Sequence, residues 1–226
     1  MKIFILTFAY RYRSRTIFIN NILNNELQNI ISGKGAIGTN SIIQTAASYL
    51  SASQKASGKI IPDEFTKEQE AAELKQFTEI HKLWYPPILT EATKIGEGAE
   101  QKVFLQKNGT TVVKINDAIF YLSWIDYFNS LLFHNYYFPD TAYNLLGFIE
   151  KQSVLYAVVE QPFVRSDALT NLDDVKIFME ANGFLVKKNN DYYHPKTGLI
   201  LEDLHEGNVL TQNGILYFVD TVFYIR

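Results

Sequence analysis

The sequence of 226 residues predicts an α+β fold, and three observations lead to that prediction. Apolar residues recur at helical spacing in much of the first 90 residues. After Thr93 the pattern changes to short strand-like runs separated by tight turns. Two of those turns read Asn-Gly, at 108–109 and 213–214. An Asn-Gly pair between apolar runs predicts a β-hairpin, because both residues tolerate positive φ.

Helices are expected first along the chain. Apolar spacing predicts helices over 16–32 and 41–51, with a loop over 32–39 and a linker over 52–62. Thr66 and Gln69 form a capping-box pattern, which predicts that a helix over 67–82 begins there. The stretch 118–134 is apolar nearly all round, which predicts a buried helix. A last helix is expected over 173–181, because Asn182-Gly183 is a typical helix end.

The strands are expected in the second half of the chain. Runs at 102–106 and 110–115 flank the first Asn-Gly turn, and runs at 208–212 and 215–219 flank the second. A continuous apolar run over 155–160 predicts a further strand. Nine aromatic residues lie between Phe120 and Phe138, so this stretch is predicted to be a seam of close packing.

Composition excludes several classes of protein. The apolar fraction is 47% and the charged fraction 20%, as in ordinary globular proteins. The chain has no cysteine, which excludes a disulfide scaffold, an iron–sulfur cluster and a cysteine nucleophile. The apolar run over 3–10 is far shorter than the ~20 residues that a membrane span needs. Three arginines follow it where a signal-peptide cleavage site would stand, so we expect no membrane association and a cytoplasmic location.

Charge is distributed unevenly. Residues 1–62 hold seven Lys or Arg and one acid, whereas the remainder holds 14 basic and 23 acidic residues. Such a basic arm is compatible with contact to nucleic acid. The alternative is that the arm lies along its own acidic body, which the spread of its charges favours.

Two motifs resemble known sites but lack an essential part. Gly33-x-Gly35-x-x-Gly38 matches a dinucleotide-binding fingerprint, yet no acid lies between Glu26 and Asp63 to bind a ribose hydroxyl. His205-Glu206 opens like a zinc-protease motif, but Val209 stands where the second histidine is required. The first motif is interpreted as a loop, and the second excludes a zinc site of that type.

The strand-rich half carries an arrangement that suits a nucleotide. Gly96 and Gly98 lie one residue apart, which lets a strand-turn-strand backbone approach phosphates, and Val103 follows to cover a base. Lys114 lies on the next predicted strand among apolar neighbours and needs an anionic partner. A plain hairpin and a surface lysine are the alternatives.

Three polar residues follow at a spacing that suits phosphoryl transfer. Asp203 and Asn208 lie five residues apart, and the predicted second hairpin returns Asp220 beside Asn208. In phosphoryl transfer an aspartate accepts the proton of the attacking hydroxyl, while asparagine and aspartate oxygens hold magnesium. The alternative is a polar turn and a strand-end acid in solvent.

Taken in this order, these residues resemble the protein kinases, and in particular the Ser/Thr/Tyr-kinase-like domain of polyvalent proteins of phages and other mobile elements. The resemblance rests on the stretches 96–104, 134–135, 138–148, 160–163, 203–210 and 218–220. It implies a two-lobed fold with ATP between the lobes: a kinase-like domain over 91–226, with a small lobe over 91–160 and a truncated large lobe over 161–226. Residues 1–90 would then be a helical extension that packs on the truncated lobe.

The resemblance also implies roles for residues. ATP would be bound by Ile95, Gly96, Glu97, Gly98, Val103 and Lys114, with adenine read by the backbone of Glu160, Gln161 and Phe163. Asp203 would be the base, Lys114 would bind phosphates, and Asn208 and Asp220 would hold Mg²⁺. The sequence departs from the kinase pattern at Gln101, Leu201, Glu202, Thr221 and Val222, and it ends at Arg226 before an activation loop.

No glutamate lies between Lys114 and Glu150, so Asp126 is predicted as the helix partner of the lysine. The expected function is ATP- and magnesium-dependent phosphotransfer to a hydroxyl that the sequence does not identify, in a protein Ser, Thr or Tyr or in a small molecule. One alternative is a nucleotide-binding pseudokinase or interaction module. A second alternative is a protein that binds nucleic acid through residues 1–62.

Overall fold

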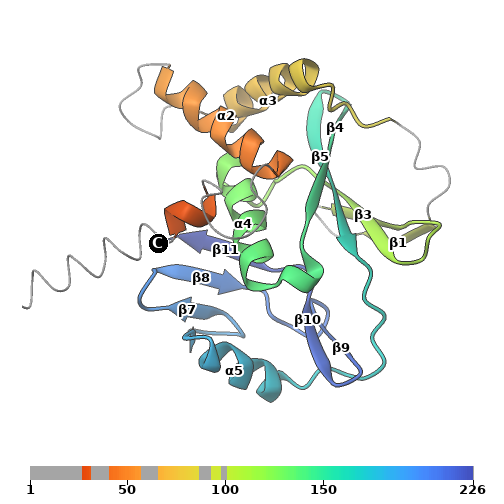
Figure 1. The fold of residues 1–226 in the computed structure, drawn as a ribbon, viewed down its shortest axis with the longest axis vertical. Helices are drawn as coiled ribbons and strands as arrows, with labels where there is room; N and C mark the ends of the chain where they lie inside the picture. The colour runs from red at the N-terminus through yellow and green to blue at the C-terminus, as the bar shows by residue number, and fades with distance from the viewer. Residues whose placement is uncertain (1–26, 32–40, 57–65, 87–92, 98–100, 226) are drawn as a thin grey trace, which may run out of the picture.

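The computed structural model describes residues 27–31, 41–56, 66–86, 93–97 and 101–225 (Figure 1). Within these ranges, helices pack with antiparallel sheets, which confirms the predicted α+β class. Residues 27–31 are helical, as expected. The predictions for 3–10, 16–26, 32–39 and 57–62 lie outside the described residues, as does Gly98.

Helices α2 and α3 lie between the helical residues 27–31 and the strands. Helix α2 (Ile42–Ala56) extends five residues beyond its predicted end, so the first part of the expected linker is helical. Its last turns are held because Ser53 and Gln54 donate hydrogen bonds to Glu73 and Glu70 of the next helix. Helix α3 (Lys67–His81) begins at the predicted capping box, in which both reciprocal hydrogen bonds are present.

Helix α4 (Trp124–Tyr137) begins six residues later than predicted. The side chain of Asn116 accepts the backbone N–H of Ala118, whose φ of 56° lies in the left-handed region. The chain therefore turns before it can form a helix, and Ser123 then caps the helix by accepting the N–H of Asp126. Residues 117–123 form a loop that reaches the pocket described below.

A five-stranded antiparallel sheet follows the strand order β1-β2-β3-β5-β4. The predicted turn at 108–109 joins its second and third strands, which confirms the first hairpin. Strand β4 is absent from the predictions because a bulge between Leu145 and Gly147 breaks its alternation. Gly147 has a φ of 148°, and a Cβ there would lie 2.1 Å from the carbonyl oxygen of Leu83. The strands are β1 (Thr93–Glu97), β2 (Gln101–Leu105), β3 (Thr111–Asn116), β4 (Asn144–Lys151) and β5 (Val154–Pro162).

The last third of the chain forms two further sheets. The predicted hairpin at Asn213-Gly214 is confirmed, since both residues have positive φ and join β9 (Val209–Gln212) to β10 (Ile215–Phe218). A four-stranded sheet has the order β11-β8-β7-β6 and was not predicted. Its strands are β6 (Leu185–Val186), β7 (Tyr192–His194), β8 (Leu199–Glu202) and β11 (Val222–Ile225), and the short helices are η2 (Pro139–Thr141) and α5 (Leu172–Ala181).

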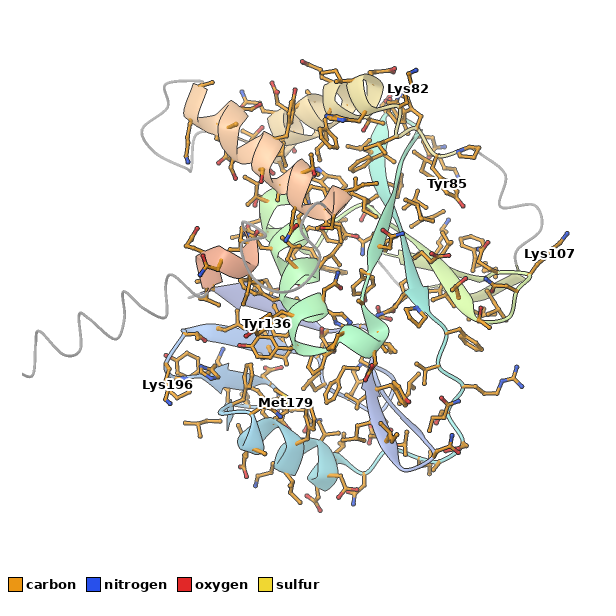
Figure 2. The ribbon with its side chains drawn as sticks, viewed as in Figure 1. Lys82, Tyr85, Lys107, Tyr136, Met179 and Lys196 are labelled. Carbon is orange, nitrogen blue, oxygen red and sulfur yellow. The ribbon has the colours of Figure 1, made fainter. Side chains whose placement is uncertain are left out.

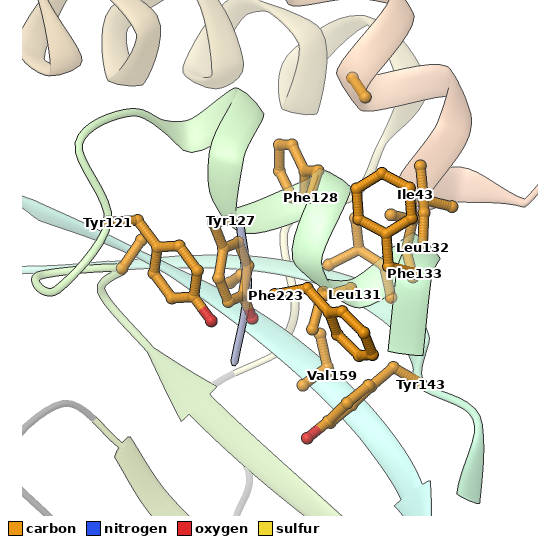
Figure 3. Close-up of a cluster of buried hydrophobic side chains, with 14 of the residues drawn as sticks. Ile43, Tyr121, Tyr127, Phe128, Leu131, Leu132, Phe133, Tyr143, Val159 and Phe223 are labelled. Atoms are coloured by element: carbon orange, nitrogen blue, oxygen red, sulfur yellow. The ribbon is translucent and has the colours of Figure 1, made fainter. Parts of the chain in front are cut away.

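The aromatic residues of α4 belong to the core, as predicted for the stretch 120–138, whereas Phe120 at the start of that stretch is 61% exposed. Rings from α4 and neighbouring segments gather in one buried cluster (Figure 3). Trp124 and Phe128 pack on Phe148 of β4, and Phe133 packs on Phe223 of β11. Buried side chains elsewhere, such as Met179 on α5, belong to the same cluster (Figure 2).

The N-terminal helices lie elsewhere than expected. Helix α2 contacts α4 and β4, and α3 contacts α2 and α4, so both pack beside the five-stranded sheet (Figure 1). The expectation that they pack on the truncated lobe is therefore wrong for these two helices. The reason is that the buried face of α2, which includes Ile43 and Leu50, joins the apolar core around α4.

Helix α3 fixes the start of α4 and the loop before it. Lys67 donates to the carbonyls of Ala118 and Tyr121. One turn later, the fully buried carboxylate of Glu70 accepts the backbone N–H of Trp124 at 2.5 Å. A carboxylate at a helix N-terminus is favoured by the helix dipole. Burial nevertheless raises the pKa of Glu70 to about 7.

Among the described residues, no helix combines the length and the apolar character that a membrane span requires.

The raised pKa of Glu70 gives a pH dependence. Between its ordinary pKa of 4.5 and about 7, the folded state holds a proton that the unfolded state has lost, so this group stabilises the fold less as pH rises. We expect the free energy of unfolding of Glu70→Gln, relative to wild type, to rise by up to ~3 kcal/mol from pH 5 to pH 8. Denaturant unfolding at several pH values measures this difference. Glu68→Gln is the control. The pKa of Glu68 is lowered, so its carboxylate is ionised in both the folded and the unfolded state above pH 5. The stability of this variant should therefore follow the same pH dependence as wild type above pH 5.

Candidate active site

The side chain of Lys114 points inward from the middle of the five-stranded sheet. It is 3% exposed and lies directly opposite Val103 on β2 and Val159 on β5. Directly paired residues of antiparallel strands face the same side, so Val103, Lys114 and Val159 share one face. The lysine is therefore buried, as predicted, and the surface-lysine alternative is excluded.

Asp203 and Asn208 are joined directly across a short loop. The side-chain nitrogen of Asn208 donates to the carboxylate of Asp203 at 2.8 Å and to its carbonyl at 3.0 Å. Nδ1 of His205 accepts the N–H of Gly207, and its Nε2 faces the Asp203 carboxylate at 3.5 Å. Asp203 has a φ of 70°, a conformation that aspartate tolerates.

Both ends of this loop are fixed by strands. Asp203 follows β8, which pairs with β11 so that Glu202 lies opposite Val222. Asn208 precedes β9, and its carbonyl accepts the N–H of Val219 just after β10. These two pairings bring Asp220 next to the loop, as the second hairpin predicted.

Asp220 forms an ion pair with the buried lysine. Nζ of Lys114 lies 2.6 Å from Oδ1 of Asp220 and 3.3 Å from the carbonyl oxygen of Val219. Burying an ammonium group is costly unless an anion and further acceptors surround it. The five-stranded sheet and the segment 219–220 are thus joined by a charged contact.

Tyr143 lies beside this ion pair and was not predicted. Its hydroxyl donates toward the carbonyl of Val219 at 2.5 Å and Asp220 Oδ1 at 3.1 Å. Nζ of Lys114 lies 5.3 Å from the centre of the tyrosine ring. Burial and the negative charge of Asp220 raise the pKa of Tyr143 well above its usual value. The sequence signal was slight, since Tyr143 lies inside the stretch 138–148 that resembles kinases.

A buried polar network anchors the chain beyond Asp220. Nδ1 of His134 on α4 lies 2.7 Å from the hydroxyl of Thr221, and its Nε2 lies 3.0 Å from the carbonyl of Thr141. Gln161 donates to the same carbonyl at 2.6 Å. Burial lowers the pKa of His134 to about 3, so the ring is neutral at ordinary pH. Thr221, which departs from the kinase pattern, thus attaches this segment to α4.

A pocket of about 230 Å³ opens onto these residues. Asp203, Asn208 and Asp220 line it together with His205. The rest of its wall comes from several elements and includes four aromatic side chains: Phe120, Tyr121, Tyr127 and Tyr143. Lys114 does not line the pocket, but its ion pair with Asp220 places it next to these residues.

The predicted nucleotide loop is described only in part. Ile95 and Gly96 lie in β1, where Ile95 is 46% exposed and Gly96 pairs with Val103 beside an irregularity in the register. Glu97 ends β1. Val103 is on the same face as Lys114, which suits its predicted place over a nucleotide.

The segment predicted to bind adenine is engaged within the protein. Glu160 lies opposite Val113 on one side and Asn144 on the other, so strands flank its backbone. The side chain of Gln161 is buried in the network around His134. The N–H of Phe163 donates to the carbonyl of Thr110 at 2.8 Å. Adenine binding here stays a prediction, and in this arrangement the N–H of Phe163 is not its donor.

The prediction that Asp126 pairs with Lys114 is wrong. Asp126 lies in the first turn of α4, where its carboxylate accepts from Ser123 at 2.7 Å. It is therefore used at the helix start, while Asp220 is the anion at Lys114.

The oxygen ligands fit magnesium. In the described part of the chain no three His, Cys, Asp or Glu gather in a way that could hold a metal. Magnesium commonly takes one or two protein oxygens with phosphate oxygens and water. The amide nitrogen of Asn208 donates to Asp203, so its amide oxygen points away from Asp203, and Asp220 lines the same pocket.

The basic residues on which the nucleic-acid prediction rests lie almost entirely outside the described residues.

Comparison with protein families gives one match. The family model described as "Serine/Threonine/Tyrosine Kinase found in polyvalent proteins" matches residues 67–226, from the first residue of α3 onward. No curated protein and no solved structure matches the chain.

The ion pair predicts coupled stability effects. Asp220→Asn leaves the ammonium of Lys114, whose side chain is 4% exposed, without an anion, so we expect a loss of about 3–5 kcal/mol of unfolding free energy. Lys114→Met combined with Asp220→Asn should recover most of that loss, because no charge remains buried. Denaturant unfolding of the three variants and wild type measures the coupling. Strictly additive losses would contradict the ion pair.

Proposed function

The chain belongs to the family of serine/threonine/tyrosine kinases found in polyvalent proteins, and on that basis we propose that it transfers the γ-phosphoryl group of ATP to a hydroxyl. The observation that carries the proposal is that Asp203, Asn208 and Asp220 line one pocket while Lys114 forms an ion pair with Asp220. Lys114 lies on β3, 106 positions before Asp220, so the contact between these two residues is not a consequence of sequence proximity.

Each residue has a defined part in the proposed reaction. Lys114, on β3 of the five-stranded sheet, would bind phosphate oxygens. Asn208 and Asp220 would hold magnesium, whose positive charge would stabilise the negative charge of the phosphates. The acceptor hydroxyl would lose its proton to the carboxylate of Asp203, which Asn208 orients and His205 approaches. Catalysis would consist mainly of positioning and charge stabilisation.

The fold would be that of a two-lobed kinase. The five-stranded sheet with α4 would form the small lobe, and the two C-terminal sheets with α5 would form a reduced large lobe. The ion pair of Lys114 and Asp220 would lie at their junction.

A second function is favoured by one observation. In protein kinases the strand lysine pairs with a glutamate on the helix that follows, and both that pair and the magnesium-binding aspartate must be in place. Here Lys114 pairs with Asp220 instead. A nucleotide-binding protein that transfers no phosphate would tolerate this arrangement.

Nucleotide binding tests both functions. At 100 times the dissociation constant, Mg·ATP should stabilise the folded chain by about 2.7 kcal/mol, seen as a raised melting temperature. If neither ATP nor GTP shifts the melting temperature, both proposals are wrong.

Asp203→Asn separates transfer from binding. We expect it to lower the rate of ATP turnover by about 10²–10⁴-fold, the usual worth of a catalytic base, while leaving the Mg·ATP melting shift intact. Asparagine also tolerates the positive φ at this position. Turnover is followed by release or transfer of γ-labelled phosphate from ATP. Asp140→Asn, at an exposed site on η2, is the control and should behave as wild type. Full turnover in Asp203→Asn would mean that the base is another group.

A further inference from the structure

Two donors hold the same two oxygen atoms at the junction of the sheets. Lys114 Nζ and the Tyr143 hydroxyl both contact Oδ1 of Asp220, at 2.6 Å and 3.1 Å. Both also contact the carbonyl oxygen of Val219, at 3.3 Å and 2.5 Å. Tyr143 and Lys114 thus donate to the same two acceptors of the segment 219–220.

Tyr143 is itself firmly held. Asn135 on α4 donates from its side-chain nitrogen to the carbonyl of Tyr143 at 2.8 Å and accepts the N–H of Tyr143 at 2.6 Å. The ring packs against His134 with centroids 4.7 Å apart, and the residue is 8% exposed. A side chain fixed at both its backbone and its ring loses little freedom when its hydroxyl makes a hydrogen bond.

We propose that Tyr143 is a positioning residue that keeps Asp220 in place when Lys114 turns to the phosphates of a nucleotide. A single ammonium that moves toward phosphate oxygens weakens its contact with Asp220. The Tyr143 hydroxyl stays on Asp220 and the carbonyl of Val219, so the aspartate remains directed at its metal position. This inference rests on the proposed function for its purpose, but the shared contacts are independent of it.

The proposal also accounts for the absence of an acid facing Lys114 from α4. Helix α4 acts on the site through Asn135, which fixes Tyr143, and through His134, which fixes Thr221. The neutral hydroxyl of Tyr143 therefore contacts Asp220, the one carboxylate that pairs with Lys114 among the described residues.

Hydrogen exchange of the backbone amides over 219–223, measured without nucleotide, tests whether Lys114 and Tyr143 both hold this segment in place. Lys114→Met and Tyr143→Phe should each keep exchange within about twofold of wild type, because one donor remains in each. The double variant should exchange about tenfold faster or more, since a hydrogen bond to a charged group is worth at least that factor. Lys114→Met with Tyr156→Phe is the matched control. Tyr156 lies on β5 next to Ala157. Because side chains alternate along a strand and Val159 shares the face of Lys114, Tyr156 lies on the opposite face of the sheet. Its hydroxyl makes no hydrogen bond to another described residue.

A double variant that exchanges no faster than Lys114→Met overturns the proposal. A wild-type protein that fails to bind ATP would overturn the proposed function and leave this exchange result untouched. Exchange of the α2 amides in the same samples shows whether the double variant is folded.

If the double variant does not fold, Tyr143→Phe alone decides. With Mg·ATP bound, its 219–223 amides should exchange about tenfold faster than in wild type, because the lysine has then left the segment. In turnover, the Mg²⁺ concentration for half-maximal rate should rise about tenfold while KM for ATP stays within about twofold. Unchanged exchange in the bound state, or an unchanged Mg²⁺ requirement, would contradict the proposal.

Discussion

The ammonium group of Lys114 lies below the surface of a β-sheet, and its only carboxylate partner among the described residues is Asp220, 106 positions further along the chain. A buried ammonium group without an anion would lower the stability of the fold by several kcal/mol. The native fold therefore has to place the carboxylate of Asp220 beside Lys114. The arrangement of the C-terminal strands follows from this constraint. Strand β8 pairs with β11 and β9 with β10, and Asp220 lies in the short link between β10 and β11.

Helix α4 supports the ion pair from behind. Its apolar surface packs between α2 and β11, which fixes the helix relative to both sheets. Its polar residues His134 and Asn135 then hold the chain on either side of the site, at Thr221 and Tyr143. Buried polar networks of this kind specify one arrangement when every member finds a partner. Helix α3 adds a third anchor, because Glu70 and Lys67 fix the loop that leads into α4.

The features that the sequence predicted correctly depend on local chemistry. Both Asn-Gly hairpins, the capping box at Thr66 and the return of Asp220 beside Asn208 require only short-range patterns. The burial of Lys114 followed from its apolar neighbours on an internal strand.

The features that were missed depend on distant contacts or on local exceptions. Asp126 lay at a suitable distance along the sequence, but its carboxylate accepts a hydrogen bond from Ser123, the N-cap of its own helix. Tyr143 contacts Asp220 across 77 residues, and no short-range pattern indicates such a contact. The start of α4 was misplaced because Asn116 turns the chain first, and β4 was missed because Gly147 interrupts its alternation.

We propose that Lys114 and Asp220 form the centre of a nucleotide and metal site. A crystal structure with a non-hydrolysable ATP analogue and Mn²⁺, located by its anomalous signal, tests this most directly. We expect a Mn²⁺ peak bound by oxygens of Asn208 and Asp220, with phosphate oxygens at Nζ of Lys114. A nucleotide bound elsewhere, or Mn²⁺ bound away from both residues, would contradict it.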